Sequence, residues 1–136
     1  MKRQERMLHE KAAEILNFFN LYDLRNSYAR QLSGGQKKLL ELARVLMAEP
    51  KMIMLDEPGA GVNPTLMNEL IDKIQQLKEQ GFTFLLIEHD MDLILRLCNP
   101  VIVMVEGQNL TEGTFNHVCR DPRVLEAYLG KRTWDC

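Results

Sequence analysis

The sequence has few of the features that mark secreted, metal-binding or membrane-spanning proteins. Its three cysteines are far apart, odd in number and without the spacing of metal ligands (Cys98, Cys119 and Cys136). A reduced cytosolic compartment is the simpler interpretation of such cysteines. The longest apolar runs have the length of strands, and the N-terminus leads into no apolar signal segment. We therefore expect any role at a membrane to come through a partner.

Strong charge of one sign is also absent, because 17 basic and 19 acidic residues give a net charge of −2. This balance provides no general attraction to nucleic acid or to anionic lipid. Apolar residues are plentiful, since 46% of the chain is hydrophobic. That fraction can build a core, so we expect one folded domain, or part of one.

Apolar segments of strand length alternate with helical patterns along the chain. Residues 5–20 carry an apolar stripe at helical spacing, Ser33 begins a helix that Pro50 ends, and 63–81 has a start and a stop signal for another helix. Further elements are predicted as strands over 52–55, 82–87 and 101–105, a turn over 106–109, and short helices over 90–97 and after Thr114 and Asp121. The alternation favours an α/β fold with a parallel sheet and a small antiparallel hairpin near the end.

The segment Leu32-Ser33-Gly34-Gly35-Gln36 combines a helix start with a pair of glycines. Ser33 and Gln36 have the spacing of a capping box. Glycines allow a ligand to approach the backbone closely, and the free N–H groups and the dipole of a helix start attract phosphate. A plain capped turn is the alternative, and the aspartate-ending strand that follows makes it less favoured.

Two carboxylates follow the apolar segment 52–55 directly. Asp56 and Glu57 are expected at the carboxyl end of a parallel strand, where α/β folds place their ligands. Asp56 can hold Mg²⁺, because this cation takes few protein carboxylates when phosphates are also bound. Glu57 can orient or deprotonate an attacking water molecule. The alternative is that both residues are solvated and only open a turn.

His89 comes after the next predicted strand and Glu88. We expect it at the same sheet edge as Asp56 and Glu57, where an imidazole can contact a terminal phosphate near neutral pH. An ordinary loop histidine is the alternative, and the neighbouring motifs favour the functional interpretation. His9 and His117 lack such a context and are interpreted as surface or helix residues.

Taken in order, Leu-Ser-Gly-Gly-Gln, Leu-Asp-Glu-Pro and Glu-His-Asp are similar to the motifs of ABC-type ATPase subunits. The resemblance covers nearly the whole chain and implies ATP and Mg²⁺ as cofactors. It assigns residues as follows: Ser33, Gly34, Gly35 and Gln36 to the signature loop, Asp56 to the Walker B carboxylate that holds the metal, Glu57 to the catalytic glutamate, Ala60 to Asn63 to the D-loop, and His89 to the switch histidine.

The resemblance also implies partners. Two subunits of that family pack head to tail, so that the signature of one closes over ATP held by the other. Ser33 and its neighbours would then act on the partner's nucleotide, while Asp56, Glu57 and His89 serve their own. Transmembrane permease subunits are implied as well, with a cytoplasmic location at the inner face of the cell membrane. A nucleic-acid partner is not expected, because the chain has no basic stripe.

The phosphate loop of such an ATPase, G-x-x-x-x-G-K-[ST], does not occur in this sequence. The expected fold is therefore a partial P-loop-NTPase-like parallel sheet with flanking helices, without the N-terminal strands and the phosphate loop. About 1–50 would be the end of the helical subdomain and the signature helix, and about 51–136 the Walker B, D-loop, His-switch and C-terminal region. An incomplete sheet is expected to expose apolar surface of the strands at 52–55 and 82–87.

Three segments resemble the ATPase subunits of branched-chain amino acid importers in particular: Ala60-Gly61-Val62-Asn63-Pro64, Ile87-Glu88-His89-Asp90-Met91 and Ala127-Tyr128-Leu129-Gly130. ATP hydrolysis that drives import is the function this implies, and a lipid exporter shares parts of the pattern. Two alternatives remain open. The chain could be a non-catalytic module that offers Ser33, Gly34 and Gly35 to another subunit, or a soluble ATPase that acts on nucleic acid or the ribosome.

Overall fold

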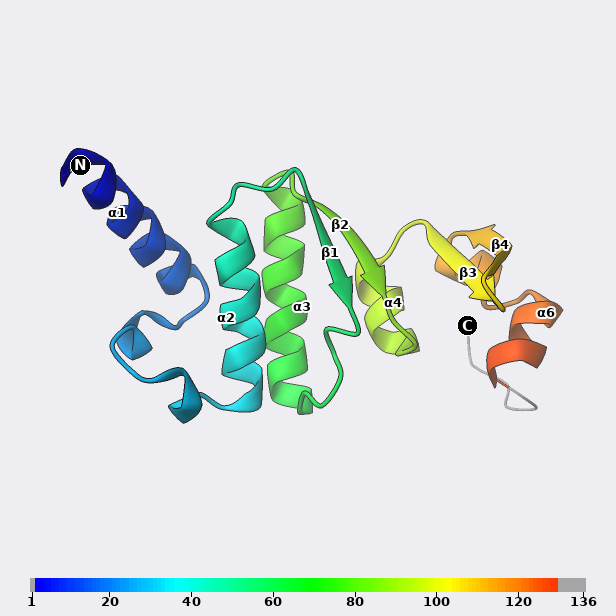
Figure 1. Cartoon of the computed structure of the whole chain (residues 1–136). Helices are drawn as coiled ribbons and strands as arrows, with labels where there is room; N and C mark the ends of the chain where they lie inside the picture. Colours follow the sequence, from blue (N-terminus) through cyan, green and yellow to red (C-terminus); the bar gives the residue numbers. More distant parts are fainter. Residues whose placement is uncertain (1, 130–136) are drawn as a thin grey trace. The chain divides into compact units, whose positions relative to one another are not determined.

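The structure is a computed structural model that describes residues 2–129. Its elements fall into two units, the first ending at Ile87 and the second beginning at Glu88. Helices α1 to α3 and strands β1 and β2 belong to the first unit (Figure 1). No helix within residues 2–129 has the length and the apolar character that crossing a membrane requires.

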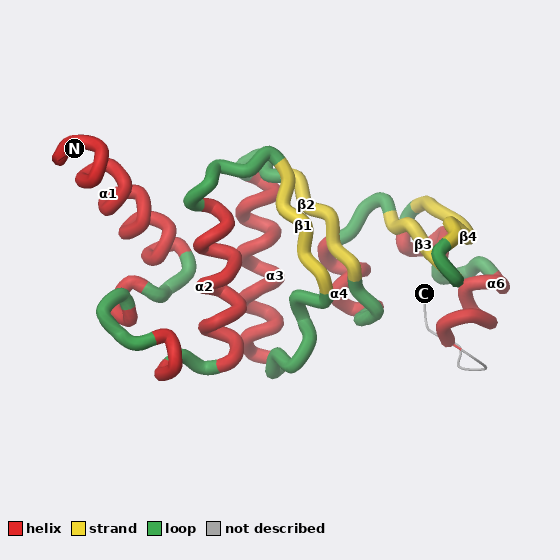
Figure 2. The backbone as a smooth tube through the Cα atoms, in the orientation of Figure 1, coloured by secondary structure: helices red, strands yellow, loops and turns green. Residues whose placement is uncertain are grey.

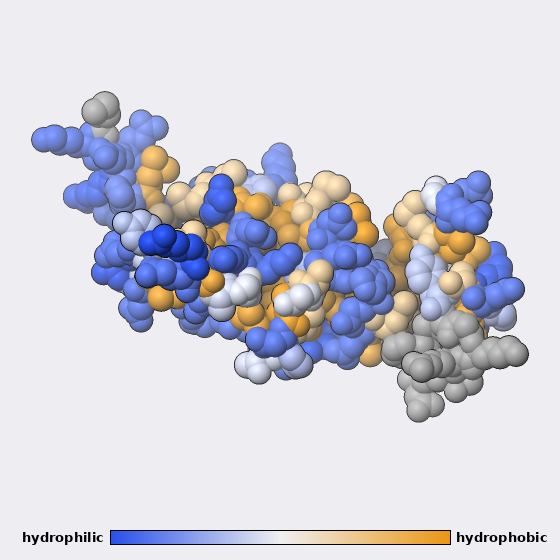
Figure 3. Space-filling model, turned by 60° about the horizontal axis from the view of Figure 1, so that its bottom comes forward, coloured by the Kyte–Doolittle hydropathy of each residue, from blue (hydrophilic) through white to orange (hydrophobic). Residues whose placement is uncertain are grey.

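Helix α1 (Lys2–Phe18) is long but mostly exposed, and none of its residues is fully buried. In Figure 3 it is largely hydrophilic, with hydrophobic residues along one side. Phe19, directly after the helix, is completely buried and anchors this end of the unit. Lys11 adds a polar link, because its Nζ donates to the Met47 carbonyl at 3.1 Å and also to the Glu49 carboxylate. Two short 3₁₀ turns, Tyr22–Leu24 and Ala29–Gln31, lead to the next helix.

Helices α2 (Gly34–Leu46) and α3 (Pro64–Glu79) run side by side (Figures 1 and 2). Each buries an apolar stripe at helical spacing, which supplies most of the core of the first unit. The buried residues are Leu39, Leu42, Ala43 and Leu46 in α2, and Leu70, Ile71, Ile74 and Leu77 in α3. Gly81 follows the C-cap of α3, Gln80, and its φ of 96° is the left-handed conformation that glycine adopts without a steric penalty.

Strands β1 (Met52–Asp56) and β2 (Thr83–Ile87) pair in parallel, and α3 is the crossover between them. Ile53, which is 2% exposed, alternates with Met52 and Met54, which are 52% and 65% exposed. On β2, Leu85 and Ile87 are exposed as well. One face of the strand pair is therefore packed on the protein, and the other is apolar and open to solvent.

The second unit contains helix α4 (Met91–Leu97) and a β-hairpin of β3 (Val101–Val105) and β4 (Gln108–Gly113). Glu106 and Gly107 form the hairpin turn, with φ angles of 49° and 78°. Positive φ at both central residues is the pattern of a two-residue type I′ turn. Helices α5 (Phe115–Val118) and α6 (Pro122–Val124) follow, and a π-helical turn (Leu125–Leu129) ends the described chain.

Most of the sequence-based elements are confirmed, and the mixture of helices and strands agrees with an α/β fold. The hairpin differs in one detail, because the turn has two residues and Gln108 and Asn109 already belong to β4. The four-residue prediction was wrong because it relied on polar composition, which does not reveal that Glu106 takes a left-handed conformation. The expected exposure of apolar strand residues is confirmed at β1 and β2.

Candidate functional site

The start of α2 has the capping box that the sequence indicates. The Ser33 hydroxyl accepts from the Gln36 amide at 3.2 Å, and the Gln36 side-chain oxygen accepts from the Ser33 amide at 2.9 Å. Ser33 is the N-cap, and Gly34 and Gly35 are the first two helical residues. The first N–H groups of a helix have no carbonyl partner within it. The motif therefore fixes the helix start and leaves the two glycine amides at an end that favours anions.

The two glycines of this motif have different surroundings. A Cβ atom added at Gly35 would lie 1.1 Å from Cδ2 of Leu66, whereas one added at Gly34 would have nothing within 4 Å. Gly35 is thus required by the close approach of α3, and it brings the starts of α2 and α3 together. Gly34 is exposed and remains open to a ligand.

Asp56 is the last residue of β1, and Glu57 follows it at the carboxyl end of the parallel strands. Both residues are exposed to solvent. The Glu57 amide donates to the Ile87 carbonyl at 2.8 Å, which extends the β1–β2 ladder by one residue. Glu57 nevertheless has a φ of 46°, the left-handed region, which costs a residue with a side chain about 1–3 kcal/mol. The backbone at the predicted catalytic glutamate is therefore held in a strained conformation, a feature the sequence does not reveal.

A groove of about 240 Å³ runs beside Asp56 in the first unit. Its walls come from α2, β1 and α3, and the lining residues are Lys38, Glu41, Leu42, Val45, Met54, Leu55, Asp56, Pro58 and Leu70. Lys38 is only partly exposed and shares the groove with Asp56. In the sequence, Lys38 and Glu41 are one helical turn apart, and this spacing could have placed both side chains on the same face of α2.

Asn63 caps α3, and its side-chain oxygen accepts from the Leu66 amide at 3.0 Å. Leu66 also packs against Gly35 in the first turn of α2. The first unit therefore gathers Ser33, Gly34 and Gly35 near the start of α3, and it places Asp56 and Glu57 together at the end of β1.

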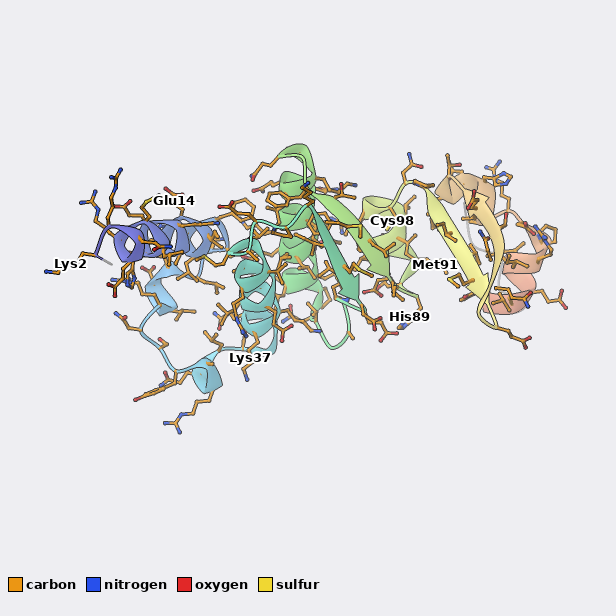
Figure 4. The ribbon with its side chains drawn as sticks, turned by 45° about the horizontal axis from the view of Figure 1, so that its top comes forward. Lys2, Glu14, Lys37, His89, Met91 and Cys98 are labelled. Atoms are coloured by element: carbon orange, nitrogen blue, oxygen red, sulfur yellow. The ribbon has the colours of Figure 1, made fainter. Side chains whose placement is uncertain are left out.

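His89 lies in the second unit, in the loop between β2 and the start of α4 (Figure 4). It is exposed and follows Ile87 by two residues. Asp90, next along the chain, is the N-cap of α4 and accepts from the Asp92 and Leu93 amides at 3.0 and 3.2 Å. The capped helix fixes the backbone on the C-terminal side of His89.

The donors at the end of β1 suit a magnesium ion that is shared with phosphates. Within residues 2–129, no group of three or more His, Cys, Asp or Glu side chains is placed to hold a metal ion. Mg²⁺ keeps several waters and usually takes one or two carboxylates together with substrate phosphates. The exposed Asp56 carboxylate, at the sheet edge where ligands bind, meets that requirement.

A parallel strand that ends in carboxylates, with a capped Ser-Gly-Gly helix start in the same unit, defines a nucleotide-binding class of α/β domain. Comparison with known proteins narrows this class. The family model described as "ABC transporter" matches residues 2–60, and the model described as "Branched-chain amino acid ATP-binding cassette transporter" matches residues 108–132. The chain belongs to the ABC transporter ATPase family.

Individual relatives agree with this assignment. The chain is 44% identical over 133 residues to the probable branched-chain amino acid transport ATP-binding protein LivG of Methanocaldococcus jannaschii, with 95% of this chain and 51% of the relative covered. It is 35% identical to the lipopolysaccharide export system ATP-binding protein LptB of Haemophilus influenzae, with 90% of this chain and 51% of the relative covered. A crystal structure of the ADP conformation of an ATP-binding cassette of an ABC transporter superposes with a TM-score of 0.84 at 43% identity, covering 92% of this chain and 51% of that one.

The chain spans about half the length of the curated relatives it matches. Of the three segments that suggest the branched-chain type, two lie within the described residues. Gly130, the last residue of the third segment, lies outside them.

Proposed function

We propose that this chain is the part of an ABC transporter ATPase subunit that carries the signature helix, the metal-binding aspartate and the catalytic glutamate. The observation that supports the proposal most directly is the pair Asp56 and Glu57 at the carboxyl end of a parallel strand. The cytoplasmic inner face of the cell membrane is the proposed location, and permease subunits and a second ATPase subunit are the proposed partners.

In this proposal Asp56 and Glu57 divide the work of hydrolysis. Asp56 holds Mg²⁺, which neutralises charge on the β- and γ-phosphates when it is bound. Glu57 accepts a hydrogen bond and then the proton of the attacking water, and it directs that water at the γ-phosphorus. His89 contributes a hydrogen bond to a γ-phosphate oxygen, and Asn63 belongs to the loop that faces the second subunit.

The start of α2 acts on the nucleotide of that second subunit. Gly34 and Gly35 supply backbone N–H groups, Ser33 supplies a hydroxyl, and Gln36 holds the helix start in shape through the capping box. The open surroundings of Gly34 support this role, because a Cβ atom placed there meets nothing described within 4 Å apart from its chain neighbours and the adjacent backbone of α2.

Branched-chain amino acid import is the proposed transport reaction. Identity to the LivG relative is 44%, against 35% for the LptB relative, and this difference favours an amino acid importer over a lipid exporter. Transport of radiolabelled leucine by the complete transporter checks the assignment. Uptake that requires ATP supports it, and export of a lipid without such uptake favours the alternative.

Substitution of Glu57 tests the hydrolytic role. In the complete ATPase subunit, Glu57→Gln should reduce ATP turnover about 10²- to 10⁴-fold, because the amide cannot accept the proton of the attacking water. Nucleotide binding should remain, since the side chain keeps its size. Glu79→Gln is the matched control, because Glu79 is an exposed glutamate at the end of α3. Normal turnover in Glu57→Gln would remove Glu57 from the mechanism.

A non-catalytic module that only donates its signature is the second candidate, and the exposed helix start at Ser33 is the observation that favours it. The test mixes this chain with a complete subunit and measures activation. Ser33→Asn keeps an N-cap, whereas Ser33→Asp keeps the cap and places a negative charge at the phosphate. Activation of the complete subunit that survives in Ser33→Asn but is lost in Ser33→Asp supports the signature-donating role. Equal activation by both variants contradicts it.

A further inference from the structure

The structure distinguishes the two cysteines of the second unit that it describes. Cys119 is disulfide-bonded, whereas Cys98, which follows α4 (Figure 4), is a thiol. The sequence has one other cysteine, Cys136, which lies outside the described residues. The bond of Cys119 therefore has two candidate partners, which are Cys136 of the same chain and a cysteine of a second molecule.

Cys119 lies beside an apolar cavity of about 70 Å³ in the second unit. It is the C-cap of α5 and only 6% exposed. Tyr128 lines the same cavity, and its hydroxyl donates to the carbonyl of Met104, which also lines it. The last turn of the described chain is therefore held close to Cys119.

The distance along the chain allows a bond within one molecule. Cys136 is eight residues beyond Tyr128, because 136 − 128 = 8. An extended chain spans about 3.3 Å per residue, so eight residues reach as far as about 26 Å. Since Tyr128 and Cys119 border one small cavity, this reach exceeds what a return to Cys119 requires. Closing so short a loop also costs little entropy.

We propose that Cys119 and Cys136 form a redox-sensitive disulfide that fixes α6 and the turn Leu125–Leu129 beside the cavity. At the proposed cytoplasmic location thiols are kept reduced, and disulfides there are usually transient and redox-sensing. The inference goes beyond the proposed function, because neither cysteine belongs to the proposed nucleotide site.

A peroxide is the oxidant in this proposal. One thiolate attacks the O–O bond of hydrogen peroxide and, with a proton, gives a sulfenic acid and water. The second thiol attacks that sulfur, the S–S bond forms, and a second water leaves. The two thiols together lose two hydrogens with their electrons, and one peroxide becomes two waters. A dithiol reductant reverses the change by exchange.

The bond would constrain elements that are weak by themselves. Helix α6 has three residues and the turn after it has five. Helical segments this short are not stable without further support. A bond from Cys119 to Cys136 encloses both elements in one loop and removes many of their open conformations. Oxidation should therefore make local opening of α6 rarer.

Peptide mapping tests the bond. The full chain is reduced, treated with hydrogen peroxide and digested with trypsin and Glu-C, which together separate the three cysteines. Mass spectrometry without reductant should find Gly113–Arg120 joined to Thr133–Cys136, lighter by two hydrogens than the two thiol peptides together. Cys136→Ser should lose this product. Cys98→Ser is the matched control and should keep it.

Hydrogen exchange tests the effect of the bond. The amides of Val124 and Leu125 donate to the Asp121 carbonyl at 3.0 and 3.1 Å. In the peroxide-treated chain they should exchange about tenfold more slowly than in the Cys136→Ser variant after the same treatment. Comparing two treated samples cancels any effect of methionine oxidation. Amides of α2 should exchange equally in both.

Four results would overturn the proposal: a bond between Cys119 and Cys98, a bond that joins two molecules, a sulfinic acid at Cys119 without any disulfide, and equal exchange of Val124 in the two treated samples. A non-reducing gel recognises the second result as a dimer. None of these measurements involves ATP. The Glu57→Gln experiment therefore judges the proposed function separately.

Discussion

At the scale of single residues, the glycines of the signature segment show that neighbouring positions in one motif can be required for different reasons. Gly35 is required by packing, because a Cβ atom there would collide with Leu66. Gly34 has no such neighbour. The motif therefore combines a glycine that packing requires with one whose surroundings are open.

Gly35→Ala should lower the free energy of unfolding by about 1–3 kcal/mol, because the added methyl group overpacks the contact between α2 and α3. Gly34→Ala should stay within about 0.5 kcal/mol of the unaltered chain. Urea denaturation measures both. The double variant Gly35→Ala with Leu66→Ala should recover part of the loss of Gly35→Ala. Equal stability of Gly34→Ala and Gly35→Ala would show that Leu66 moves aside freely.

Asp121, the N-cap of α6, has a carboxyl pKa lowered from 3.8 to about 2, chiefly by the hydrogen bond from the Arg123 side chain and then by that from the Arg123 amide. Arg123 Nη2 lies 2.7 Å from Asp121 Oδ2. The lowered pKa stabilises the folded chain above pH 3.8, and this contribution is lost as the pH falls through about 2. Arg123→Met should raise the pKa of Asp121 in an NMR titration, while Arg120→Met should leave it in place.

At the scale of elements, α1 depends on a few contacts with the rest of the first unit. Lys11 donates to the last turn of α2 at Met47 and to Glu49, and it lowers the pKa of the Glu49 carboxyl through a hydrogen bond and through its charge. A cation at the C-terminal end of a helix also interacts favourably with the helix dipole. This one side chain therefore links α1 to α2.

Lys11→Met should lower the free energy of unfolding by about 1 kcal/mol, because the Met47 carbonyl loses a charged donor. Hydrogen exchange of the α1 amides should accelerate, while that of α3 should not. Lys2→Met, at the exposed start of α1, is the matched control. Unchanged exchange in α1 after Lys11→Met would mean that apolar contacts alone hold the helix.

An element could be predicted from the sequence where the interactions that start and end it join residues close together in the chain. The capping residues Ser33, Asn63 and Asp90 and the stop at Gly81 act within a few residues, and the sequence predicted all of them. The contact of Gly35 with Leu66 and the link from Lys11 to Glu49 join residues far apart in the chain, and no local pattern indicates them. The roles of Glu57, His89 and Asn63 are still predictions, because they concern bound nucleotide.

At the scale of the molecule, the two units differ in how many fully buried side chains they contain. The first unit buries long stripes of α2 and α3, whereas the β3–β4 hairpin of the second has Ile102 and Met104 exposed. Two-stranded hairpins are marginally stable without further packing. In native-state hydrogen exchange, amides of α2 and α3 should be protected longer than those of β3 and β4. Equal protection would indicate that residues 2–129 open in one cooperative step.

The left-handed backbone of Glu57 lowers the stability of the fold at the position of the predicted catalytic residue. A left-handed residue with a side chain costs about 1–3 kcal/mol that glycine avoids, and asparagine tolerates the same conformation better than glutamate. Random mutagenesis with selection for heat resistance alone should therefore enrich Gly or Asn at position 57. The selected variants should be more thermostable and should lack ATP turnover. Directed evolution of this protein would have to select for turnover at every round, because its predicted catalytic residue is one that thermostability selection discards.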